Sequence, residues 1–95
     1  MSTFGGGRPY YIAATATLVI GGTGSAAKLN TVTVNTGAAS AVLTIYDGPS
    51  AAVGRKIAVI DASASKSLNF GGSVCKDGIT VVLSGGNADC TVNAG

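Results

Sequence analysis

Any catalysis by this chain would fall to four aspartates, two cysteines and three tyrosines, because the sequence contains neither histidine nor glutamate. Asp47 and Asp77 each precede a glycine, which is ordinary turn chemistry, since aspartate bonds nearby backbone and glycine accepts positive φ. Asp61 and Asp89 fall at the ends of predicted strands. No D-x-D-x-D spacing of a calcium loop is present. We therefore expect neither an enzyme nor a metal site.

The segment "LVIGGTGSAAKL" comes closest to a nucleotide-binding motif, because Gly22-x-Gly24-x-x-Ala27 follows a strand-like run. A dinucleotide site would need a helix next, and an acidic residue about 20 positions on. Residues 25–29 instead run into Thr-Val-Thr-Val, which favours a strand. Lys28 also lacks the neighbouring glycine and Ser/Thr of a phosphate loop. A glycine turn between strands is predicted, with no cofactor and no small-molecule substrate.

Cys75 and Cys90 flank what looks like the last hairpin of the chain, with fourteen residues between them. If the turn centres near Gly86, Cys90 lies opposite Val82 and Cys75 lies beyond the end of the ladder. A disulfide needs Cα atoms within about 7 Å and an oxidising compartment. Two buried free thiols are expected, with a disulfide as the alternative. A zinc site would lack a third histidine or cysteine.

Composition limits the partners of the chain. Ninety-five residues suit one domain, and only 11% are charged, against about 25% in typical proteins. The six basic residues, which leave a net charge of +2, are spread along the chain, so no nucleic-acid footprint is expected. The apolar stretch 10–20 is interrupted by threonines and is too short for a membrane helix. Neither a membrane nor a secretion signal is predicted.

Fifteen glycines, ten threonines and a scarcity of strong helix formers predict an all-β fold. Seven segments carry period-two alternation or β-branched enrichment. They are residues 11–20, 30–36, 41–46, 55–61, 66–70, 78–84 and 89–94.

Their spacing predicts a single compact antiparallel β-sandwich of about seven to eight strands, in jelly-roll or Greek-key connection. It occupies residues 10–95 and follows a flexible glycine-rich arm over residues 1–9. Residues 30–36 and 41–46 are predicted to form one hairpin, and 78–84 and 89–94 another.

Side-chain alternation assigns residues to the core. In the single strand 11–20, Ile12, Ala14, Ala16, Leu18 and Ile20 are predicted to face inward. Further along the chain the inward residues are Val32, Val34, Ile57, Val59, Leu68 and Phe70.

The block from Lys28 to Val92 contains "LNTVTVNTGAASAVLTIYDG", "RKIAVID" and "GITVVLSGGNADCTV". With these strand phrases it resembles small β-sandwich proteins encoded among the structural genes of tailed bacteriophages. The resemblance implies a non-enzymatic virion component made in the bacterial cytoplasm. It would be a capsid decoration or cement protein on the head surface, and its partners would be the major capsid protein and copies of itself in a homotrimer.

The alternative is a tail or fibre module that binds a host receptor or glycan. Only Tyr46 and Phe70 supply aromatic rings outside the amino-terminal segment, and tryptophan is absent, so stacking surfaces for sugars are few. That shortage favours the capsid.

The opening segment "MSTFGGGRPYY" joins three glycines to side chains that are favoured in protein interfaces. Glycines let a chain cross between surfaces without steric cost. Phe4, Arg8, Tyr10 and Tyr11 are therefore predicted to contact the capsid or a second subunit. The alternative is a frayed terminus.

Overall fold

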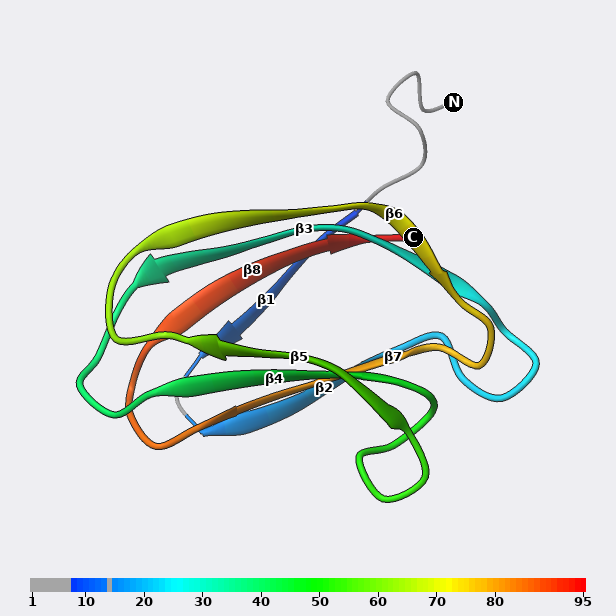
Figure 1. The fold of residues 1–95 in the computed structure, drawn as a ribbon, viewed down its shortest axis with the longest axis horizontal. Coiled ribbons are helices and arrows are strands. Elements are labelled where there is room, and N and C mark those ends of the chain that lie inside the picture. Colours follow the sequence, from blue (N-terminus) through cyan, green and yellow to red (C-terminus); the bar gives the residue numbers. More distant parts are fainter. Residues whose placement is uncertain (1–7, 14) are drawn as a thin grey trace.

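Two four-stranded antiparallel β-sheets pack face to face in the computed structural model (Figure 1). The structure describes residues 8–13 and 15–95. Its strands are β1 (Arg8–Ala13), β2 (Ala16–Ile20), β3 (Ala27–Thr36), β4 (Val42–Asp47), β5 (Arg55–Asp61), β6 (Lys66–Cys75), β7 (Ile79–Ser84) and β8 (Asp89–Ala94). The all-β prediction and the predicted number of strands are confirmed, and the described residues form no helix.

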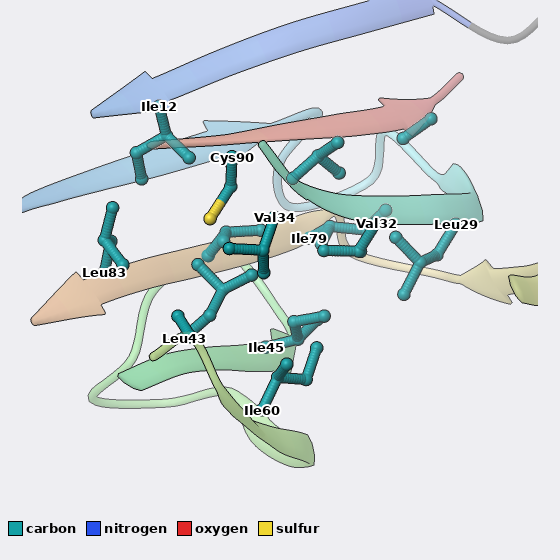
Figure 2. Close-up of a cluster of buried hydrophobic side chains, with 14 of the residues drawn as sticks. Ile12, Leu29, Val32, Val34, Leu43, Ile45, Ile60, Ile79, Leu83 and Cys90 are labelled. Carbon is teal, nitrogen blue, oxygen red and sulfur yellow. The ribbon is translucent and has the colours of Figure 1, made fainter. Parts of the chain in front are cut away.

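Alternating side chains build one core between the sheets. Val32 and Val34 of β3 are almost completely buried, as predicted, and lie on the inner side of one sheet. Leu43 and Ile45 of β4 and Ile79 of β7 line the same core from the other sheet (Figure 2). Each such side chain contributes about 1.5–3 kcal/mol on burial. The core is therefore made of medium-sized aliphatic groups that both sheets supply.

The strand orders show how the chain moves between the layers. Sheet A has the order β1-β8-β3-β6, and sheet B has the order β2-β7-β4-β5. Consecutive strands therefore lie in different sheets at every connection except β4 to β5. Among the described residues, only that pair forms a hairpin of neighbours in both sequence and sheet.

Both predicted hairpins are wrong. β3 pairs with β6 and β8, whereas β4 pairs with β5 and β7. β8 likewise pairs with β1 and β3, not with β7. The turn residues do reverse the chain, but each reversal carries it into the opposite sheet. A turn signal specifies the reversal and not the sheet of the next strand.

The predicted single strand 11–20 is also wrong, because the chain leaves sheet A after Ala13 and enters sheet B at Ala16. Ile12 and Ile20 are buried as expected, since β1 and β2 line the same core from opposite sheets. Ala16 is exposed. Ala14 lies outside the described residues.

In β5 the inward assignment of Ile57 and Val59 is wrong. Their side chains are 41% and 60% exposed, and Ile60 is the buried residue. Pairing with β4 sets the phase: Ala58 lies opposite the buried Ile45 and Ile60 lies opposite the buried Leu43, so the residue between them faces outward. A β-bulge separates this part of β5 from Lys56. Leu68 and Phe70 of β6 pack against the core, as predicted.

The amino-terminal strand begins at Arg8, so two residues assigned by sequence to the arm belong to sheet A. Arg8 pairs with Ala94, and Pro9 pairs with Asn93 of β8. Residues 1–7 of the predicted arm lie outside the described residues.

The predicted glycine turn after β2 is confirmed, and Gly21 is its tightest point. Gly21 has φ +76, and a Cβ there would lie 2.5 Å from the Ser25 carbonyl oxygen. Gly22 has no such φ, and a Cβ there would meet no atom within 4 Å. The two neighbours therefore differ in their need for glycine.

We expect Gly21→Ala to lower the free energy of unfolding by about 1–2 kcal/mol or more, because alanine resists positive φ and its methyl meets backbone. Gly22→Ala is the matched control, with no loss and a gain of up to about 1 kcal/mol. Urea unfolding measures both. Equal losses in the two variants would contradict this description of the turn.

Candidate functional site

The predicted interface residues separate onto different sides of β1. Tyr11 is 63% exposed and lies on the outer side of sheet A, whereas Tyr10 is half-buried and packs against the core. Arg8 is exposed at the start of the strand. Phe4 lies outside the described residues. Among the four, Tyr11 is the aromatic ring that β1 presents to the exterior.

Tyr11 is held by Asp89, the first residue of β8. Its hydroxyl donates to Asp89 Oδ2 at 2.7 Å, and the Thr36 backbone N–H donates to Oδ1 of the same carboxylate at 2.7 Å. The bond from Tyr11, with a smaller effect of Thr36, lowers the pKa of Asp89. The same hydrogen bond raises the pKa of Tyr11. This exposed contact fixes the edge strand to its neighbour.

The outer side of sheet A is polar across its central rows, and the exposed Val74 lies towards one end of it. One row crosses all four strands from Tyr11 through Thr91 and Thr33 to Ser67, because directly paired residues project to the same side. Several of these side chains bond to one another: Asn35 Nδ2 donates to Thr91 Oγ1 at 2.9 Å, and the Thr33 and Ser67 hydroxyls lie 3.3 Å apart. We define the polar face as Tyr11, Thr31, Thr33, Asn35, Ser67, Asn69, Thr91 and Asn93.

The outer side of sheet B is apolar by comparison. A row runs from Thr17 through Val82 and Thr44 to Val59, and Val19 lies in the adjacent row. Val19 is 47% exposed, and no strand or loop of the described residues covers Val59. We define the valine face as Thr17, Val19, Val42, Thr44, Tyr46, Val59 and Val82. Its charged neighbours, Lys56 and Asp61, lie on the edge strand β5.

A third feature is a cavity of 360 Å³ between the β4–β5 loop and the β6–β7 turn. The two segments are joined by a hydrogen bond from the Gly48 N–H to the Gly78 carbonyl, 2.9 Å long. The buried Thr80 hydroxyl donates to the Gly48 carbonyl at 2.9 Å and holds the loop from the other side. The lining residues are Asp47, Val53, Gly54, Arg55, Lys76 and Asp77.

Charge is concentrated around this cavity, because four of the ten charged side chains in the sequence line it. Two carboxylates can accept hydrogen bonds there, and one guanidinium and one ammonium can donate. Asp77 Oδ1 also accepts from the Gly24 N–H at 3.1 Å, which joins the β2–β3 turn to the cavity wall. A polyhydroxylated or zwitterionic group matches this set of donors and acceptors.

Sequence reasoning missed the cavity and interpreted Asp47 and Asp77 only as turn residues. Asp77 is a turn residue, whereas Asp47 is the last residue of β4, and each precedes a glycine of positive φ. The β-sandwich brings together these two turns, 30 positions apart in the sequence. The two Asp-Gly pairs in the sequence could have indicated two chain reversals, but not how close together the fold brings them.

The cysteines are free and buried, as predicted. Cys75 pairs with Ala27 and Cys90 with Val34, seven residues further along β3, so more than about 20 Å separates them at about 3.3 Å per residue. The predicted position of Cys90 opposite Val82 is wrong, because β7 and β8 lie in different sheets. Burial raises the pKa of both thiols. These are unreactive packing residues.

Within residues 8–13 and 15–95, no three His, Cys, Asp or Glu side chains gather as metal ligands would. Nor does this part of the chain contain a helix of sufficient length and apolarity to cross a membrane. Comparison of the chain with protein-family models and with curated proteins found no match.

The hydrogen bond between Tyr11 and Asp89 predicts how stability depends on pH. Since folding lowers the pKa of Asp89, its contribution to stability is present above the ordinary carboxyl pKa of about 4 and is lost as pH falls. We expect Tyr11→Phe to raise the Asp89 pKa toward its ordinary value, measured by NMR titration of the carboxyl carbon. Tyr10→Phe, on the opposite side of β1, is the control and should leave it unchanged. An unaltered Asp89 pKa in Tyr11→Phe would contradict the contact.

Proposed function

We propose that the chain is a non-enzymatic structural protein of a phage virion, which decorates the capsid and stabilises it by binding the lattice of the major capsid protein. The protein would be made in the bacterial cytoplasm and would act on the head surface. The observation that carries this proposal is the contrast between its two sheet faces.

The polar face satisfies many of its hydrogen-bonding groups internally, through contacts such as that between Asn30 Nδ2 and Asn93 Oδ1 at 3.2 Å. The valine face has no such compensation and leaves Val19 and Val59 in water. Exposed apolar patches on small soluble domains mark protein interaction sites. We therefore assign the valine face to the capsid lattice and the polar face to solvent.

The connectivity supports the jelly-roll alternative of the predicted fold. A jelly roll is a double-sheet sandwich of eight strands, which is common in viral capsid proteins and lectins. The jelly roll is favoured over a simpler Greek key by the strand orders, which are β1-β8-β3-β6 and β2-β7-β4-β5. The chain crosses between these two sheets at every connection but one. Because fold alone does not specify function, this is supporting analogy and the surface carries the argument.

The predicted threefold arrangement and interface arm belong to the head-bound state in this proposal. Three copies would surround a local threefold position of the lattice, with residues 1–7 reaching a neighbour or the capsid. Tyr11 and Arg8, on the exposed margin of sheet A, would flank the start of this arm.

The mixed-charge cavity favours the second candidate, a tail or fibre module. Carboxylates beside Arg55 and Lys76 match the hydroxyls and acidic groups of a glycan. The cavity is polar, and no aromatic ring of the described residues lines it, so a sugar would lack a stacking partner among them. Because the cavity lacks this partner and the valine face exposes apolar side chains, the capsid proposal is preferred to the tail or fibre module.

To test the proposal, purified protein is sedimented with empty heads that lack it. We expect Val19→Lys to weaken head binding by about tenfold or more, because an ammonium would be buried without a partner. Val74→Lys is the matched control: Val74 is 63% exposed on β6, outside the valine face, and its replacement should leave binding intact.

Failure of the unmodified protein to bind heads would overturn the capsid proposal. Equal effects of the two lysine variants would overturn the assignment to the valine face. Binding to an immobilised glycan, abolished by Arg55→Gln and without any binding to heads, would establish the tail or fibre alternative.

A further inference from the structure

The edge of sheet B formed by β5 has an unused row of backbone hydrogen-bonding groups. β5 pairs with β4 on one side, and no other strand of the described residues lies on its other side. Its Ile57 and Val59 side chains are also exposed. Exposed edges of this kind accept a further strand unless something prevents it.

The sequence of β5, "RKIAVID", complements itself when reversed. Two copies in antiparallel pairing centred on Ala58 would place Ile57 of one opposite Val59 of the other. In this register Arg55 of each strand would lie directly opposite Asp61 of the other, and Lys56 would lie one position further from the end of the ladder. Opposite charges on neighbouring strands favour pairing.

Asp61 is held in place for such a contact. The Ser63 backbone N–H donates to Asp61 Oδ1 at 2.9 Å. Lys56 and Asp61 lie on the same side of sheet B, because they pair with Tyr46 and Val42, whose side chains share its outer face. Across a twofold axis their charges would therefore lie on one surface.

Charges and bulges on an edge strand usually prevent pairing, and β5 has both. Here the signs differ at the two ends, with two cations at one and an anion at the other. A parallel copy would bring like charges together, whereas an antiparallel copy brings opposite charges together. The same residues that reject other strands would therefore select this chain as its own partner.

We infer that β5 pairs antiparallel with β5 of a second copy, in the register centred on Ala58, and joins two B sheets into one. The partner is a second copy of this chain, and the contact is twofold. It cannot by itself build a trimer, so on a capsid it would join copies of neighbouring trimers. The contact forms without heads and does not depend on the proposed function.

Two charge variants test the pairing. The acidic-edge variant carries Arg55→Glu and Lys56→Glu, and the basic-edge variant carries Asp61→Lys. Each alone brings like charges together, and we expect its self-association to weaken about tenfold or more relative to the unmodified protein. An equimolar mixture should recover a heterodimer, detected by native mass spectrometry. Recovery requires both variants to be folded, which separates the charge effect from misfolding.

Cross-linking tests the register. Under mild copper-catalysed oxidation, a mixture of Ile57→Cys and Val59→Cys should form a disulfide-linked heterodimer, while each variant alone should remain largely unlinked. The natural thiols do not interfere, because both are buried.

A monomeric unmodified protein at high micromolar concentration would overturn the inference. So would a trimer that persists in both charge variants, or cross-linking of the single variants in preference to the mixture. None of these results depends on heads, so head binding is tested separately.

Discussion

The need to share one core between two sheets determines most of this structure. Six of the seven connections carry the chain from one sheet to the other, so strands adjacent in sequence seldom pair. Sheets in a sandwich lie about 10 Å apart, and each crossing must turn sharply at an end of the layers. Gly85, between β7 and β8, has φ +85, and a Cβ there would collide with the Ser40 carbonyl oxygen of another crossing loop. Crossing loops thus pack on one another.

Local patterns predicted the strands well, because alternation is a property of a few adjacent residues. Val32 and Val34 could be assigned inward from "NTVTVNT" alone. Pairing could not be assigned, since "TGAAS" and "GGN" signal reversal equally well in a hairpin and in a crossing. In β5 the inward residues were assigned wrongly, because this edge strand has apolar residues on both sides. The pairing of Ala58 with Ile45 and of Ile60 with Leu43 decides which of them face the core.

The candidate sites were less predictable than the fold. Tyr11 could be selected by residue type, but its bond to Asp89 joins residues 78 positions apart. The valine face depends on the neighbouring order of β2, β7, β4 and β5, which no single segment encodes. The polar face has the same origin, since Thr33 and Thr91 are neighbours only because β8 pairs with β3. The order of the strands brings the residues of each candidate site together, and the sequence alone shows only which residue types are available.

The two proposed contacts make different use of sheet B and are compatible with each other. Binding through the valine face uses side chains perpendicular to the sheet, whereas pairing through β5 uses backbone groups in its plane. A twofold axis perpendicular to the sheet leaves the valine faces of both copies on the same side. A domain of this size buries only about 60–70% of its unfolded surface, so any contact restricted to the folded state adds stability by mass action. An edge that recruits a second copy would therefore stabilise each domain. It would also present two valine faces to one lattice, and two linked faces bind more tightly than either face does alone.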